Sequence, residues 1–196
     1  MLLRPCPQLM VLSRRLPFAV LLTLAGCQKD NVDPNGLPRA TQSGQNTAGF
    51  LENGQPWLPK QSTLLGSGPA VQARYGPSYR GPYELSVGLF RHQDSNHYQI
   101  LTLHLAGARR PGTYALEQEI DPGVITRVRP SHALYQASGP RMNGNFYTGP
   151  TARGQVVITR LDTVARVVAG TFEATVKRDG GLDSLRLSQG RFDVKY

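Results

Sequence analysis

Between Ala48 and Tyr196 apolar and polar residues alternate with a period of two, which is typical of β-strands that bury one face. Leu85, Val87 and Leu89, for example, fall on one side of such a strand. No stretch in this region repeats apolar residues at helical spacing. The alternation predicts strands at 70–75, 83–89, 98–105, 113–116, 124–128, 132–137, 155–161, 166–177 and 184–196. We therefore predict an all-β, antiparallel domain of about nine to eleven strands, mostly in a meander.

Turn residues punctuate this pattern. Asn53-Gly54 separates Phe50-Leu51 from Trp57-Leu58, and this pair favours a type I′ hairpin turn because both central residues need a positive φ. Asp121-Pro122-Gly123 is a second strong turn signal. The apolar phase of the last strand changes at Gln189-Gly190, which predicts a β-bulge. Sandwiches and barrels both bury one face of each strand, so we favour a β-sandwich and keep an open calycin-like barrel as the alternative.

The segment before Cys27 has a different character. It contains three arginines, no acidic residue and an apolar run over 16–25. A basic start, a short apolar run and small residues before a cleavage point are typical of a secretory signal peptide, here over 1–26 and expected to be helical. The run is too short to span a bilayer, which takes about 20 residues. A start at Met10 would give a signal of more usual length.

Leu24-Ala25-Gly26-Cys27 resembles the lipobox of bacterial lipoproteins. The resemblance implies that the Cys27 thiol receives a diacylglyceryl group and that the new amine is acylated after cleavage. Two or three acyl chains anchor a protein firmly, whereas one chain binds only marginally. An ordinary secreted protein with a cysteine near the cut is the alternative. Gln28-Lys29-Asp30 is similar to the signal that sends Bacteroidota lipoproteins to the outer face of the outer membrane, so we expect surface exposure, with periplasm-facing placement as the alternative.

Residues 28–47 are rich in Pro, Gly, Asn and Ser, with Val32 and Leu37 as their only large apolar side chains. This composition predicts a flexible tether, which would span about 25 Å for roughly 20 residues. The expected organisation is therefore a signal peptide (1–26), a lipidated cysteine with a disordered tether (27–47) and a single β-domain (48–196).

Composition narrows the possible partners. Removing a signal that contains Arg4, Arg14 and Arg15 lowers the count of Lys and Arg from 22 to 19 against 13 acids, a net charge of +6. The basic residues are dispersed, whereas a nucleic-acid-binding protein usually presents a continuous basic stripe, so we expect no nucleic-acid partner. Cys6 would leave with the signal and Cys27 would be acylated, so the β-domain has no disulfide and depends on its core.

Several groups of residues resemble a family of uncharacterised Bacteroidota outer-membrane lipoproteins. They are Thr47-Ala48-Gly49-Phe50, Asn53-Gly54, Trp57, Gly154–Asp162, Gly170–Glu173 and Gly190–Val194. The resemblance covers most of residues 47–196. Because the family is a domain of unknown function, it implies an envelope lipoprotein but no particular activity.

No catalytic motif stands out, so we predict no catalytic residue, no cofactor and no enzyme. His92, Asp94 and His97 have side chains that can ligate a metal. A polar turn uses the same kinds of residue for local backbone bonding, and no fourth ligand is evident, so we predict no metal site. Paired carboxylates for glycoside cleavage would have to come from Asp162, Glu173 or Asp193, which lie on different strands.

A stretch rich in Gly and Pro, residues 66–83, holds tyrosines beside arginines that could stack on sugars or bind phosphates. The residues of this possible ligand loop are Arg74, Tyr75, Tyr79, Arg80 and Tyr83. The alternative is a connection whose tyrosines simply pack on the sheet.

The leading hypothesis is a lipid-anchored envelope lipoprotein whose β-domain is a binding or structural module. Its partners would be the membrane, through the acylated Cys27, and a glycan or an envelope protein. A carrier of a small apolar ligand in an open barrel is one alternative. A hydrolase acting on envelope or external glycans, through the carboxylates or the histidine-bearing turn, is the other.

Overall fold

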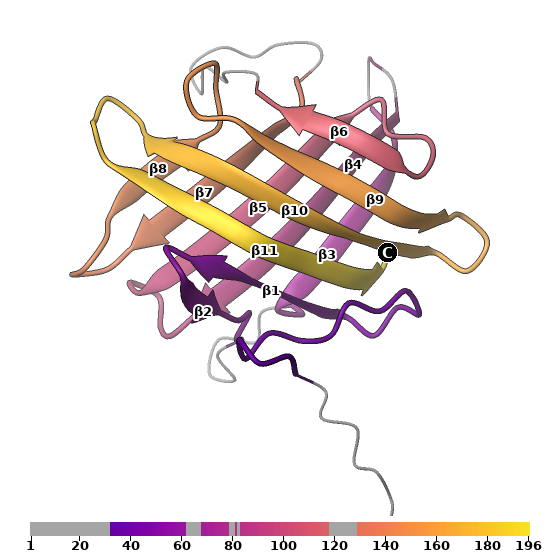
Figure 1. Cartoon of the computed structure of the whole chain (residues 1–196), viewed down its shortest axis with the longest axis horizontal. Helices are drawn as coiled ribbons and strands as arrows, with labels where there is room; N and C mark the ends of the chain where they lie inside the picture. Colours follow the sequence, from indigo (N-terminus) through magenta and orange to yellow (C-terminus); the bar gives the residue numbers. More distant parts are fainter. Residues whose placement is uncertain (1–31, 62–67, 79–80, 82, 118–128) are drawn as a thin grey trace, which may run out of the picture.

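The computed structural model describes residues 32–61, 68–78, 81, 83–117 and 129–196. Within these residues the chain forms eleven strands, all paired antiparallel, and no helix (Figure 1). They are β1 (Thr47–Glu52), β2 (Gln55–Trp57), β3 (Val71–Pro77), β4 (Tyr83–His92), β5 (Tyr98–Ala106), β6 (Gly112–Leu116), β7 (His132–Ser138), β8 (Gly144–Tyr147), β9 (Gly154–Asp162), β10 (Val167–Arg178) and β11 (Ser184–Lys195). The predicted antiparallel all-β fold is confirmed.

All eleven strands belong to one sheet that curls on itself. Its main order is β2-β1-β11-β10-β8-β7-β5-β4-β3. A branch leaves this order at β10, where β9 pairs with β10 and β6 pairs with β9. The N-terminal part of β10 pairs with β9, whereas Lys177 and Arg178 at its end pair with β8. Strand β10 thus connects a layer of β1, β11, β9 and β6 to a layer of β8, β7, β5, β4 and β3 (Figure 1). The result is a half-barrel in which two layers face each other, as in a sandwich, while hydrogen bonds run from one to the other.

The chain after β2 brings the two layers together at one edge. The Lys60 amide donates to the Phe90 carbonyl at 2.9 Å, and the His92 amide donates to the Lys60 carbonyl at 2.8 Å. Further along the same edge, the Tyr75 ring of β3 lies 5.6 Å from the ring of Tyr196, which follows β11. The bridge at Lys60 fixes the end of β4, where the candidate site lies.

The predicted alternation places one face of each strand in a continuous core. The largest fully buried side chains include Trp57, Tyr135, Phe50 and Phe146. Phe50 stacks on Trp57 with ring centroids 4.6 Å apart, so the hairpin at the start of the domain is anchored in the core. Each fully buried large apolar side chain contributes about 1.5–3 kcal/mol, and the domain depends on this term for its stability.

Two of the local features predicted from the sequence are present, and the turn predicted at Asp121-Pro122-Gly123 lies outside the described residues. Asn53 (φ 48°) and Gly54 (φ 84°) have the positive φ values that a type I′ turn requires. The pairing of β11 with β10 and β1 shifts register next to Gly190, and Gln189 has a φ of 53°. A Cβ on Gly190 would lie 2.5 Å from the Phe172 ring, so the bulge also needs glycine for close packing. The predicted bulge is confirmed.

Residues 32–46, which we expected to belong to the tether, pack on the outer face of β1 and β11. Leu37 is fully buried. Asp193, which is only 1% exposed, accepts hydrogen bonds from the Thr41 hydroxyl (2.6 Å) and from the amides of Ser43, Gly44 and Gln45 (2.7–3.2 Å). The described domain therefore includes residues before the predicted boundary at Ala48. Composition did not reveal this because a segment held by one buried carboxylate needs few apolar residues.

Ion pairing and backbone hydrogen bonds reinforce the same segment, which we call the N-terminal strap (residues 32–46). Asp33 lies 2.9 Å from the Arg191 guanidinium and accepts the amides of Asn35 and Leu37. Burial alone would raise the pKa of Asp193, but its hydrogen bonds outweigh burial and lower that pKa. The strap is thus part of the folded unit at neutral pH.

Other expectations fall outside the described residues or are revised. Cys27, the signal peptide, residues 28–31 and the predicted strand 124–128 lie outside them. The stretch 138–151, for which we predicted no strand, contains the short strand β8. The described residues include no helix with the length and apolar character that crossing a membrane requires.

Candidate functional site

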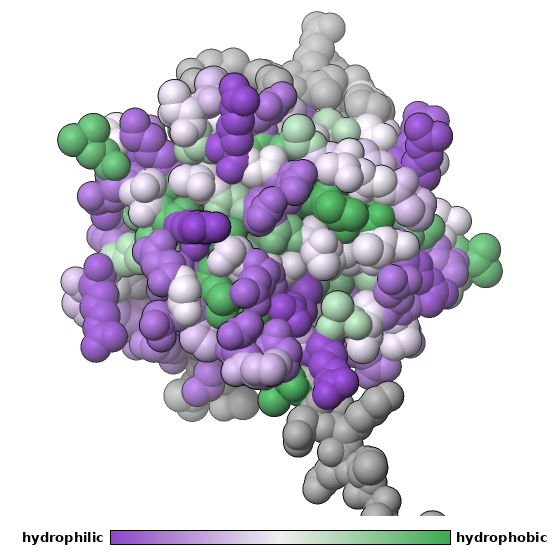
Figure 2. Space-filling view, in the orientation of Figure 1, coloured by the Kyte–Doolittle hydropathy of each residue, from purple (hydrophilic) through white to green (hydrophobic). Residues whose placement is uncertain are grey.

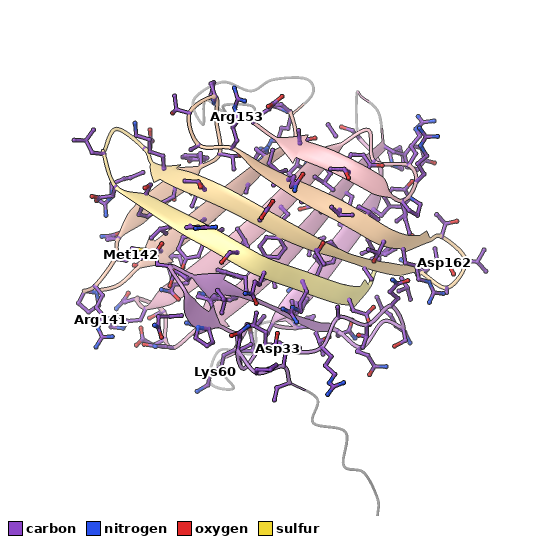
Figure 3. All side chains as sticks on the ribbon, in the orientation of Figure 1. Asp33, Lys60, Arg141, Met142, Arg153 and Asp162 are labelled. Atoms are coloured by element: carbon purple, nitrogen blue, oxygen red, sulfur yellow. The ribbon has the colours of Figure 1, made fainter. Side chains whose placement is uncertain are left out.

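A polar cleft of about 760 Å³ opens at the end of the half-barrel where β4 and β5 join. It is lined by Glu52, Arg91, Gln93, Asp94, His97, Tyr98, Gln99 and the loop 138–142. Figure 3 shows Arg141 and Met142 at this end of the sheet and Asp162 at the opposite end. Three segments far apart in sequence therefore meet here: the end of β1, the β4–β5 turn and the β7–β8 loop.

Arg91 is held firmly in the wall of the cleft. Its Nε donates to the Leu58 carbonyl at 2.9 Å, and its guanidinium carbon lies 4.5 Å from the centre of the Trp57 ring. Gln99 Oε1 accepts from the Trp57 indole N–H at 2.8 Å and from Arg91 Nη1 at 3.4 Å. Burial lowers the pKa of Arg91, but an arginine this close to solvent stays charged at neutral pH.

Glu52 provides a negative charge on the same wall. Its Oε1 accepts a hydrogen bond of 2.5 Å from the hydroxyl of Tyr135, whose side chain is fully buried. Burial and then the Glu52 charge raise the pKa of Tyr135, so the phenol keeps its proton and acts as a donor. The Glu52 carboxylate is therefore fixed by a buried hydroxyl beneath it.

The polar turn supplies Asp94 and His97. His97 Nδ1 lies 2.6 Å from Asp94 Oδ2, and Asp94 Oδ1 accepts the amides of Asn96 and His97. These hydrogen bonds lower the pKa of Asp94, the His97 ring first among them. A Cβ on Gly139 would lie 3.4 Å from the His97 ring, so loop 138–142 passes directly against it.

His92 does not join the pair. Its ring packs instead against the rings of Phe90 and Tyr98, with centroid distances of 6.2 Å and 5.8 Å. Among the described residues no group of three His, Cys, Asp or Glu side chains is arranged to hold a metal ion. Asp94 has the local turn role that the sequence offered as an alternative to metal binding.

The possible ligand loop is only partly described, because Tyr79 and Arg80 lie outside the described residues. The Tyr75 and Tyr83 rings lie 5.4 Å apart, and the Arg109 guanidinium lies 5.0 Å from the Tyr83 ring centre. Arg74 is adjacent to Tyr75 on β3 and so projects from the other face of the sheet. Tyr75 thus packs against Tyr83 and Tyr196, while Tyr83 itself is exposed.

The three carboxylates considered for glycoside cleavage occupy separate structural roles. Asp162 pairs with Arg160 at 2.8 Å and caps the turn after β9 through the amides of Val164 and Ala165. Glu173 accepts from the Gln155 side chain at 2.8 Å, and Asp193 holds the N-terminal strap. Each of these acids thus has a structural partner, and none of them lines the cleft.

A buried histidine pair lies on the outer face of β5 and β7. The rings of His104 and His132 stack 5.0 Å apart, and both side chains are buried. His132 Nδ1 lies 2.7 Å from the Pro130 carbonyl, and burial lowers its pKa to about 4. This pair is neutral at pH 7, as expected of packed strand histidines.

A second, shallower groove crosses the outer face of β9, β10 and β11, lined by residues such as Gln155, Glu173 and Arg186. On the face that Figure 2 shows, hydrophilic and hydrophobic residues are interspersed and the hydrophobic ones are scattered. The groove lacks the buried, firmly held polar groups of the cleft, so the cleft is the candidate site.

Comparison with known proteins adds no assignment. No family model matches the chain, and no curated protein or solved structure is significantly similar to it.

Proposed function

We propose that this protein is a lipid-anchored envelope lipoprotein whose β-domain binds a polar ligand, a glycan, in the cleft between β1, the β4–β5 turn and the loop 138–142. Acylation of Cys27 would hold it in the outer membrane, with the domain exposed at the cell surface. Membership of the Bacteroidota lipoprotein family that the sequence resembles is part of the same proposal. One observation supports the ligand-binding part of this proposal: polar side chains from three segments that are distant in sequence converge on a concave site.

The chemistry of the cleft supports a sugar rather than an apolar ligand. Carboxylate, amide and guanidinium groups supply both donors and acceptors for hydroxyl groups, and Tyr98 adds an aromatic surface. An apolar ligand carrier would need small residues on the inner face. The inner face instead carries a continuous cluster of large side chains that includes Phe50, Trp57 and Phe146.

A glycan array tests this proposal. The chain from residue 27 on, with Cys27→Ser to prevent acylation, is applied to envelope and plant glycans, and each hit is measured by calorimetry. The variant Gln93→Ala/Tyr98→Ala removes two lining side chains, and we expect it to weaken binding at least about tenfold, the equivalent of 1.4 kcal/mol. Gln155→Ala, in the shallow groove, is the matched control. Binding that the double variant leaves unchanged would place the ligand elsewhere.

The Asp94–His97 pair favours a hydrolase as the second candidate, since a carboxylate beside Nδ1 orients an imidazole for general-base catalysis. The distinguishing experiment incubates each bound glycan with wild type and His97→Gln and measures its products. Turnover that His97→Gln abolishes while binding persists would support the hydrolase. Bound glycan recovered intact would exclude it for that ligand.

A further inference from the structure

The charged side chains of the cleft differ in how they are paired. Asp94 accepts three hydrogen bonds from the turn that contains it, and Glu52 accepts one from Tyr135. Within the described part of the chain, no carboxylate forms an ion pair with the guanidinium of Arg91 or Arg141. The carboxylates of the cleft thus have hydrogen-bond donors within the protein, whereas neither arginine is in ion-pair contact with a described carboxylate, although the Glu52 charge acts on Arg91 at longer range.

Arg91 is also prepared for a ligand. A guanidinium has five N–H donors in a planar fork. Protein acceptors in the described residues use Nε and Nη1 of Arg91, which leaves Nη2 without one. The Trp57 ring and the Leu58 carbonyl fix the plane of the fork, so little side-chain entropy remains to be lost on binding.

Arg141 is the second arginine that lines the cleft. It lies in the loop 138–142, next to Met142, which packs partly on the core. Its side chain is exposed and has no hydrogen bond to another described residue. The loop is positioned by the hydrogen bond of 2.8 Å from the Ser138 hydroxyl to the Asn96 carbonyl, which ties it to the turn of Asp94 and His97.

We propose that the cleft recognises an anionic saccharide, whose carboxylate or phosphate is bound between Arg91 and Arg141. This inference rests on the proposed function and names the ligand chemistry of the same site. Planar carboxylates and phosphates match a guanidinium fork, and such charge-assisted hydrogen bonds are about twice as strong as neutral ones. The hydroxyl groups of the sugar would be bound by Gln93, Glu52 and Asp94.

The test uses matched pairs of sugars that differ only in charge. Trigalacturonate is compared with its methyl ester, and galactose 6-phosphate with galactose, on the mature chain with Cys27→Ser. Trp57 is the single tryptophan, and Arg91 lies over its ring, so its fluorescence reports occupancy of the site; calorimetry gives the Kd. The charged member of a pair should bind at least about tenfold more tightly than the neutral one and lose affinity as salt rises.

Variants connect this preference to the two arginines. Arg141→Gln should weaken binding of the charged sugar about tenfold and leave the neutral sugar unaffected, whereas Arg186→Gln, exposed on β11, should change neither. Arg91→Lys should also weaken binding of the charged sugar. If Arg91→Lys fails to fold, Arg141→Gln still tests the proposal. The pair that shows the preference identifies the anion as carboxylate or phosphate.

Two negative results have different meanings. Equal binding of charged and neutral sugars, unchanged by Arg141→Gln, would overturn the anionic specificity and leave glycan binding standing. No binding of any of these sugars, together with a blank glycan array, would overturn the proposed function as well.

Discussion

Asp193 should be one of the most sensitive single positions for stability outside the apolar core. Its carboxylate accepts one hydroxyl and three backbone amides from the N-terminal strap while almost completely buried. A hydrogen bond to a charged group contributes about 1.5–3 kcal/mol, and contributions that share one acceptor are not additive. Asp193→Ala should therefore lower the free energy of unfolding by about 3–5 kcal/mol, because it leaves buried amides unpaired. Thr41→Val removes one of the bonds and should cost about 1–2 kcal/mol.

Urea unfolding followed by Trp57 fluorescence measures these differences. The sign of the pH dependence follows from the lowered pKa of Asp193. Because the folded pKa lies below the unfolded value of about 3.9, the contribution is complete above that pH and is lost as pH falls through the folded pKa. Asp193→Ala should lack this acid-dependent loss. Trypsin should also cleave faster after Arg39, within the strap. A change below about 1 kcal/mol with unchanged cleavage at Arg39 would refute the role given to Asp193.

Further predictions concern other sites. Burial lowers the pKa of His132 to about 4, so the neutral imidazole favours the folded state and stability should fall as pH drops from about 6.5 towards 4. In urea titrations, His132→Gln should lose less stability over this pH range than the wild type. An identical loss would show that protonation of His132 is not its cause. Gly170→Ala would place a Cβ against the Val157 carbonyl oxygen and should destabilise by about 1–3 kcal/mol in thermal unfolding, whereas Gly76→Ala, with open space around it, should not. Gln99→Leu removes the acceptor of the Trp57 indole and should lower stability by about 1–3 kcal/mol while shifting the tryptophan emission; an unchanged spectrum would oppose the hydrogen bond.

Local rules predicted the parts of the fold that local chemistry determines. The alternation placed Leu85, Val87 and Leu89 in the core, where they are buried. Asn53-Gly54 and the phase change at Gly190 predicted a turn and a bulge because each depends on a few adjacent residues. The curl of the sheet was not predictable in this way, since it depends on β10 pairing with β9 along most of its length and with β8 at its end.

The site shows the same division. His97 and Asp94 were recognisable as a polar pair because they lie in one turn. Arg91, Glu52 and Arg141 carried no signal, because their significance depends on three segments that meet only in the folded chain. Likewise, the N-terminal strap is ordered by Asp193, which lies about 150 residues away along the chain. The composition of the strap alone could not predict these hydrogen bonds.

The measurement that tests the central proposal most directly is an NMR titration of the mature, Cys27→Ser chain with the tightest-binding glycan from the array. We predict that amide shift changes concentrate in residues 91–99 and 138–142 and that the Trp57 indole signal shifts with them. Changes concentrated instead at Tyr75, Tyr83 and Tyr196 would show that the ligand binds at these packed tyrosines and would contradict the assignment of the cleft.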